Sequence, residues 1–517
     1  VTPPPTVTPP PTTEVLSDEV AARFLMQSTF GPTDESVDEL TSLGYEKWLD
    51  SQFSKTGGTL LAYVNDAADN STNDARNAHL QGAWWRASVT NPDQLRQRVA
   101  FALSQIFVAS TEGSGLTDER WRGLANYYDL LAKNAFGNFR TLLEDVTLNP
   151  IMGRYLSMHR NRKPNPAKFI HPDENYAREV MQLFTIGLVM LNQDGSQQLD
   201  AQGKPIPTYT QQDIEGLAHV FTGWTDAGAN AAGSFNPGRN LFEPMEAWAP
   251  QHDTQAKTIV TGVAIPSGLT AEQELKIALD TLFNHPNVGP FIGKQLIQRL
   301  TSSNPSKEYV SRISAVFNNN GSGVRGDLKA VVRAILLDAE ARGNTPKKLK
   351  EPAIRQAGLW RAFNARSTSG NFHYQSAGTD FGQGALNSNT VFNFYRPDYK
   401  HSGKFANSNM ESPEFQITNE SQMTTLSNRF LTHIKQTNTD PNKPVMNLSK
   451  AWSMATNSQQ MVNYLDLMLT ANALPDTAKN IIREHIDALP SATDADKTER
   501  VIDAIYLIMS QAEQAAQ

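Results

Sequence analysis

Cysteine is absent from the 517-residue chain. Its absence excludes thiolate nucleophiles, disulfides, thiolate zinc sites and cysteine-held iron–sulfur clusters. It does not fix the compartment, because cytosolic and exported proteins can both lack cysteine. Long hydrophobic runs are also missing, since no apolar run approaches the roughly 20 residues that a membrane-spanning helix needs. We therefore expect a folded body without a membrane span.

Basic stripes and standard catalytic signatures are absent as well. The chain has 46 Lys and Arg against 53 Asp and Glu, and its cations are scattered, which argues against a nucleic-acid partner. It contains no Gly-x-Ser-x-Gly elbow, no P-loop, no Gly-x-Gly-x-x-Gly after a strand and no His-Glu-x-x-His. No single motif therefore identifies a chemistry.

Strand-like alternation is rare, and apolar residues instead recur at helical spacing. The sequence predicts an all-α fold, a large multi-helix body of one or two lobes, because one core rarely grows beyond about 250–300 residues. The expected helices lie within residues 17–31, 34–53, 91–110, 126–150, 271–285, 288–302, 309–319, 327–342, 351–364, 458–470, 479–489 and 498–514.

Two regions break the helical pattern. Turn residues separate short apolar runs at about 233–265, which predicts a minor β hairpin. Residues 365–420 are rich in Gly, Asn, Ser and aromatics and predict long irregular loops. A loop of that length within a compact domain is usually functional. We assign 15–517 to a single large helical domain.

The first fourteen residues, VTPPPTVTPPPTTE, repeat a Val-Thr-Pro-Pro-Pro unit and hold no large apolar residue beyond valine. Such a composition favours an extended, semi-rigid spacer. It resembles the Pro/Thr-rich linkers of secreted bacterial polysaccharide-degrading enzymes. We interpret 1–14 as a linker to an upstream module, with a disordered tail as the alternative.

Six segments together resemble one bacterial family, catalogued as domain of unknown function 1800. They are AARFLMQSTFGPT, RQRVAFALSQIFV, ENYAREVMQLFTIG, YTQQDIEGLAHVFTGW, HDTQAKTIV and HPNVGPFIGKQLIQRL, in order from about Ala21. The resemblance implies a protein that is often exported and often encoded beside sulfatase-like proteins, and it carries no established activity. Where many members have Glu and His, this chain has Gln182 and Phe184.

The stretch HPDENYAREVMQLFTIGL is the first candidate site. On a helix of about 100° per residue, His171, Glu174, Asn175, Arg178 and Gln182 share one face, with Glu179 at its margin. An amphipathic helix with a Glu174–Arg178 ion pair would explain the same pattern. The mixture of imidazole, carboxylates, amides and guanidinium nevertheless predicts His171, Glu174 and Glu179 as catalytic and Asn175 and Arg178 as substrate-binding.

Two later segments add candidates. Asp213 has the Thr-x-x-Asp spacing of a capping box, and it is also a candidate partner carboxylate for Glu174 or Glu179. The loop QHDTQAK holds His252 and Asp253 as catalytic candidates and Lys257 as a substrate-binding one, although turn chemistry alone would explain them. Trp224 is a candidate sugar platform, with core packing the favoured alternative.

A third candidate region is FNFYRPDYKHSGKF. Arg396 and Asp398 stand among aromatics there, a composition suited to a carbohydrate-binding rim. Tyr395 and Tyr399 are predicted to stack on sugar rings, or else to fill the core of the loop.

These features lead to two hypotheses of different classes. The first is a secreted or periplasmic hydrolase that acts on extracellular polysaccharide or its decorations, by carboxylate and histidine acid–base chemistry or with a divalent metal. The second is a non-catalytic secreted helical scaffold or adaptor that docks a partner such as a sulfatase-like protein. The enzyme hypothesis predicts that His171, Glu174, Asp213 and His252 line one open pocket. The scaffold hypothesis predicts that they are scattered or sealed.

Overall fold

Capping side chains mark the beginnings of many helices. The computed structural model describes residues 16–69, 75–112, 120–374 and 376–517. Ser17 caps the first helix by accepting a hydrogen bond from Val20, as its position before an acidic turn predicts. Thr33 and Ser36 form a capping box at the second helix, which kinks at Gly44 (φ 72°). The N-terminal helices are α1 (Asp18–Ser28), α2 (Asp34–Ser54), α3 (Leu60–Asp69), α4 (Asn77–Thr90), α5 (Gln94–Ser104), α6 (Arg120–Asn134), α7 (Phe139–Thr147) and α8 (Pro150–Tyr155).

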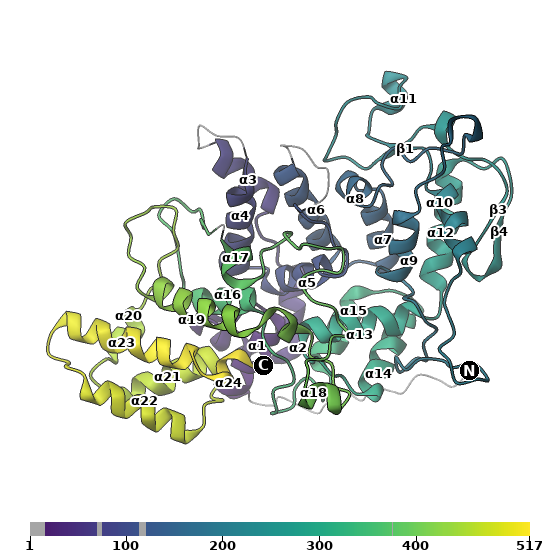
Figure 1. Ribbon diagram of the computed structural model, residues 1–517. Coiled ribbons are helices and arrows are strands. Elements are labelled where there is room, and N and C mark those ends of the chain that lie inside the picture. The colour runs from purple at the N-terminus through teal and green to yellow at the C-terminus, as the bar shows by residue number, and fades with distance from the viewer. Residues whose placement is uncertain (1–15, 70–74, 113–119, 375) are drawn as a thin grey trace.

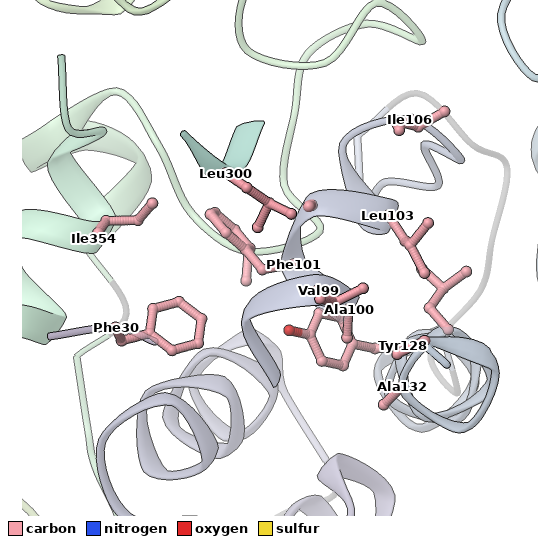
Figure 2. Packing of buried hydrophobic residues seen from close by; sticks show 14 of the residues in the cluster. Phe30, Val99, Ala100, Phe101, Leu103, Ile106, Tyr128, Ala132, Leu300 and Ile354 are labelled. Carbon is pink, nitrogen blue, oxygen red and sulfur yellow. The ribbon is translucent and has the colours of Figure 1, made fainter. Parts of the chain in front are cut away.

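Helix α5 lies at the centre of the hydrophobic core. Its Val99 and Phe101 are 1% exposed, and it packs against α1, α2, α4 and α6. Figure 2 shows these side chains between Tyr128 of α6 on one side and Phe30 and Ile354 on the other. Buried hydrophobic residues form a connected cluster that runs from Leu16 to Met509.

A cluster of indoles joins α4 to a helix far along the chain. Trp84 and Trp85 of α4 have ring centroids 4.7 Å apart, and Trp85 meets Trp360 edge-on at 5.1 Å. All three rings are 1% exposed. The third belongs to α16 (Pro352–Ala362), which contacts α4 directly.

The middle of the chain carries two small sheets beside helices. In Figure 1 these elements lie together at one side of the molecule. Strand β1 pairs antiparallel with β2, and β3 pairs antiparallel with β4. The elements are η1 (Pro166–Lys168), α9 (Asn175–Gln182), α10 (Gln211–Val220), β1 (Trp224–Thr225), α11 (Ala229–Ala232), β2 (Glu246–Ala247), η2 (Ala249–Gln251), β3 (Lys257–Ile259), η3 (Val260–Gly262), β4 (Val263–Ile265) and α12 (Ala271–Asn284).

The remaining helices cover the core and extend to the C-terminal end. Helices α19 to α23 pack on one another at the side of the molecule opposite α9 and α10 (Figure 1). The elements after α12, apart from α16, are α13 (Val288–Leu300), α14 (Lys307–Asn318), α15 (Leu328–Leu337), α17 (Ala377–Phe381), α18 (Lys404–Asn407), η4 (Pro413–Ile417), α19 (Glu420–Ile434), α20 (Ser449–Ser453), α21 (Ser458–Thr470), α22 (Asp476–Ala488), α23 (Asp494–Met509) and α24 (Ala512–Ala515).

The architecture confirms a mainly α-helical fold with minor β structure. The predicted hairpin region, 233–265, contains β2 and the β3–β4 hairpin, whereas β1 begins earlier, at Trp224. Between α16 and α19 the chain forms only the short elements α17, α18 and η4, so the predicted irregular loops are present. The predicted linker, 1–14, lies outside the described residues.

Candidate functional site

Helix α9 carries the first predicted site and is strongly amphipathic. Tyr176 and Ala177 are buried on one face, and Asn175 on the other is exposed. At its start Glu174 forms an ion pair with Arg178 at 3.2 Å, the i,i+4 pair that the spacing predicts. Glu174 also accepts hydrogen bonds from the side chain of Gln211, which opens α10. Glu174 and Arg178 thus help to join α9 to α10.

Glu179 lies apart from that pair. Its side chain is buried, and burial raises the pKa of its carboxyl, with the nearby Arg178 opposing the shift. One of its oxygens, Oε2, has no hydrogen-bond partner within the described parts of the chain. Glu179 is therefore a buried carboxyl that is not held by an ion pair.

Helix α10 uses its predicted acidic residue at its own start. The Asp213 carboxylate accepts hydrogen bonds from the backbone and side chain of Thr210, and Thr210 in turn caps the Asp213 N–H. The capping-box interpretation of this pair is confirmed. One face of α10 packs on β3, and at its other end His219 Nδ1 lies 2.5 Å from Asp253.

The predicted loop residues form a sealed network. His252 is 2% exposed, and its Nε2 lies 3.3 Å from Glu274, which is fully buried. Lys257 pairs with the same carboxylate at 2.6 Å and donates to the Asp253 carbonyl. Burial alone would raise the pKa of Asp253, but hydrogen bonds from His219 and Gln255 lower it below its ordinary value. Lys257 and His252 thus fasten the loop to α12, and the substrate-binding role of Lys257 stays a prediction.

The predicted residues consequently do not line one open pocket. Helices α9 and α10 and the 252–257 loop do pack together. His252, however, is sealed, and Asp213 is engaged in its cap. His171 is exposed and lines a different cavity of about 580 Å³ with Arg154, His159, Arg160 and Arg162, which we call the basic pocket. The catalytic roles of the residues predicted from the sequence stay predictions. These residues are His171, Glu174, Glu179, Asp213, His252 and Asp253.

Two predicted sugar-stacking aromatics are buried instead. Trp224 is 3% exposed in β1, which favours the core alternative. Tyr395 is 3% exposed, and burial, together with the nearby carboxylates of Glu351 and Glu414, raises the pKa of its phenol well above the ordinary value. Composition does not reveal which side of a loop is covered, and the substrate-binding roles of Trp224 and Tyr395 stay predictions. Tyr399 is half-buried.

Arg396 and Asp398 do reach a cavity. The side chains pair with each other at 2.7 Å, and both line a space of about 680 Å³ that we call the amide-lined cavity. Its walls come from the end of α5, the end of α9, one face of α13 and the loop 391–398. Five glutamine side chains line it: Gln105, Gln182, Gln197, Gln295 and Gln298.

The rim of the amide-lined cavity is apolar. Leu188 is 57% exposed and Phe392 is 45% exposed, and Phe291 lines the same wall. Large apolar side chains left in solvent around a concavity are typical of binding sites. On one wall Glu411 pairs with Lys294 at 2.9 Å and accepts a hydrogen bond from Gln298 at 2.7 Å.

The floor of the amide-lined cavity holds polar atoms without protein partners. Gln295 Nε2, Gln105 Oε1 and Arg299 Nε are buried, and none has a hydrogen-bond partner in the portion of the chain that the structure describes. Buried polar atoms are nearly always satisfied by protein or water. These three atoms are closed to solvent, so they lie behind the surface of the cavity and are not free groups on it.

The residues at the floor of this cavity were not among the sites predicted from the sequence. Gln295, Gln298 and Arg299 belong to α13, which is buried over almost its whole length. Three polar side chains on a helix buried on nearly all sides are the signal that would have identified them. Gln105 is a polar residue in the apolar stretch VAFALSQIFVA and carries the same signal, whereas Glu411 stands in an ordinary polar context.

Within residues 16–69, 75–112, 120–374 and 376–517, no group of three or more His, Cys, Asp or Glu side chains is placed to hold a metal ion. Over the same residues no helix combines the length and apolar character needed to span a membrane.

Comparison with known proteins gives one match. The model of a family described as a protein of unknown function, DUF1800, matches residues 23–515. Neither the curated proteins nor the solved structures contain a match to the chain.

Proposed function

The chain belongs to the family described as a protein of unknown function, DUF1800. From the geometry of its cavities, we propose that it acts on extracellular polysaccharide bound in the amide-lined cavity. The observation that carries the proposal is the composition of this cavity. It combines an exposed aromatic and aliphatic rim with the amide groups of five glutamine side chains.

A sugar ring has apolar C–H faces and hydroxyl edges. Phe392 and Phe291 offer rings for the faces. A glutamine amide both donates and accepts hydrogen bonds, so it matches hydroxyl groups, which do the same. Gln197 is exposed at the cavity and Gln182 is half-buried there, so their amides would supply donors and acceptors to a sugar. The volume of about 680 Å³ suits a ligand of a few sugar rings.

Cleavage would require an acid and a base. Glycosidic hydrolysis ordinarily uses two carboxylates on either side of the scissile bond. Asp398 and Glu411 line the cavity, and we assign them this role in preference to Glu174 and Glu179, which do not line it. Arg396 and Lys294 pair with the two carboxylates and would hold them in position.

The first test is binding. Purified full-length protein is titrated with plant and bacterial polysaccharides by affinity electrophoresis. Phe392→Ala should weaken binding by about 10-fold, because the rim loses its exposed ring. Phe242, which is 43% exposed and does not line the cavity, provides the matched control, and Phe242→Ala should bind like wild type. Equal binding by both variants would reject the cavity as the site.

The second test is cleavage. Release of reducing ends is measured with and without a chelator. Asp398→Asn and Glu411→Gln should abolish release while binding persists, and the chelator should leave wild-type activity intact. Loss of activity with the chelator would instead support metal-assisted hydrolysis.

The scaffold hypothesis has an observation of its own. Glu174, Asp213, His252 and Lys257 all make interactions that join or cap elements. Buried and capping charges of this kind are expected in a non-catalytic adaptor, for which a sulfatase-like protein is the suggested partner. Absence of binding to every polysaccharide in the screen would favour this function.

A further inference from the structure

The basic pocket is a second concavity, separate from the amide-lined cavity. It lies where α8 ends and the loop toward α9 begins. It is open to solvent and has a volume of about 580 Å³. Its walls carry Arg154, Arg160 and Arg162 together with two histidines. The carboxylate on its wall is Asp173, whose Oδ1 accepts the Asn175 N–H at the start of α9.

A buried carboxylate holds the cationic wall in place. Asp226 is fully buried and lies 2.6 Å from Arg154, 2.9 Å from His159 Nε2 and 3.3 Å from Arg160. Burial alone would raise the pKa of Asp226, but the hydrogen bonds from His159 and Arg154 hold it well below its ordinary range. Two guanidinium groups share this one carboxylate, so the wall keeps a positive excess at neutral pH.

Arg162 adds an uncommitted charge. It is exposed on the same wall, and within the described residues it makes no ion pair or side-chain hydrogen bond. The free guanidinium of Arg162 lies on the same wall as the two that Asp226 orients. Such a wall suits an oxyanion, because one guanidinium can donate two parallel hydrogen bonds to two oxygens of the anion.

The backbone of this wall is strained. Ser157 (φ 64°) and Arg160 (φ 60°) adopt the left-handed region, which non-glycine residues rarely occupy. The surrounding backbone imposes it: the Arg160 N–H donates to the Trp224 carbonyl and the His159 N–H to the Gly153 carbonyl. Strain that neighbouring structure maintains is typical of functional sites.

An exposed aromatic residue directly precedes two residues that line the pocket. Phe169 is 89% exposed, and its own backbone is left-handed (φ 54°). Paired hydrogen bonds between Asn165 and Ile170 close the turn that presents it, and Ile170 and His171 line the pocket. The turn holds the Phe169 backbone next to the pocket, where its ring can pack on the apolar face of a ligand.

We propose that the basic pocket binds an oxyanion, a sulfate, phosphate or carboxylate group, carried on a sugar ring that packs against Phe169. The pocket is too large for an inorganic oxyanion alone and is within the usual range for small organic ligands. A nucleic acid is disfavoured, because the chain has a net charge of −7 and no basic stripe. The site is independent of the amide-lined cavity and would bind its ligand even if that cavity takes none.

The test is calorimetric titration of the full chain with glucose 6-sulfate, glucose 6-phosphate, glucuronate, glucose, inorganic sulfate and inorganic phosphate. At least one charged sugar should bind about 10-fold more tightly than glucose and than the matching inorganic ion. Failure of every charged sugar to exceed glucose would overturn the proposal, and equal affinity for sugar and inorganic ion would overturn the sugar carrier.

Variants locate the site. Arg162→Gln should weaken the charged sugars by about 10-fold. Lys47→Gln, which removes an exposed cation from α2, should leave them unchanged. Phe169→Ala should weaken the charged sugars but not the inorganic ions. If Arg162→Gln binds the charged sugars with wild-type affinity, the basic pocket is rejected as the binding site. The melting temperature of Arg162→Gln shows whether this variant is folded.

Discussion

At the residue scale, Glu179 shows how burial changes the role expected of a carboxylate. The nearest cation, Arg178, is paired with Glu174, and Glu179 Oε2 has no partner among the described residues. A buried ion pair would be strongly destabilised by loss of one member, by about 3–5 kcal/mol. That cost does not apply to Glu179, because it forms no ion pair with any residue that the structure describes.

We therefore expect Glu179→Gln to stabilise the protein by about 1 kcal/mol at pH 7 to 8, since an amide removes a poorly solvated charge. The folded-state pKa is raised, so the native state favours the protonated acid. The charged Glu179 carboxylate therefore destabilises the folded state increasingly as pH rises above the pKa of Glu179 in the unfolded chain. This destabilisation disappears near pH 4. Thermal unfolding at pH 4 and pH 7.5 measures the difference, with the exposed Glu215→Gln as control. A loss of 3 kcal/mol or more at pH 7.5 would contradict this account.

Asp226 presents the opposite case. Asp226→Asn leaves Arg154 and Arg160 without their shared carboxylate and should cost about 3–5 kcal/mol at pH 7. The folded-state pKa lies below the ordinary value, so this stabilisation is present above about pH 4 and is lost as pH falls further. Urea unfolding at pH 7 and pH 3 checks both parts. Asp38→Asn, an exposed carboxylate on α2, should have little effect, and equal stability of Asp226→Asn and wild type at pH 7 would refute the prediction.

At the element scale, the sequence predicts helices well and their surroundings poorly. Ser17 and the Thr210–Asp213 pair identify helix starts because capping is local and depends on residues three apart. Whether a polar face is covered depends on distant segments. Lys257 meets Glu274, and Tyr395 lies among Glu351 and Glu414, through contacts that no local pattern encodes. The fold class was therefore predictable, whereas the covering of Lys257 and Tyr395 by distant segments was not.

The contact between α10 and β3 gives a prediction at this scale. Gly216 faces the strand so closely that a Cβ there would overlap the carbonyl oxygen of Thr258. Backbone cannot move aside as a flexible side chain can, so Gly216→Ala should destabilise the protein by about 1–3 kcal/mol or more. Gly343→Ala is the control, because its Cβ would make only ordinary contacts. Chemical denaturation compares the two, and an unchanged midpoint for Gly216→Ala would contradict the close packing.

At the scale of the whole molecule, a linker and a folded body predict different responses to truncation. Residues 1–14 contain no large apolar side chain that would offset the entropy lost on ordering. Deleting them should leave the melting temperature within experimental error. Differential scanning calorimetry of the full and shortened chains tests this expectation, and a drop of several degrees would show that the segment docks on the body.

The indole cluster of Trp84, Trp85 and Trp360 has an optical consequence. Rings held edge-on at about 5 Å in a rigid, asymmetric setting couple their electronic transitions, which gives strong circular dichroism in the near ultraviolet. Two of the rings belong to α4 and the third to α16, so the coupling of Trp85 to Trp360 exists only while these helices stay together. The near-ultraviolet spectrum would therefore report directly on the junction between the early and late parts of the chain, without any added label.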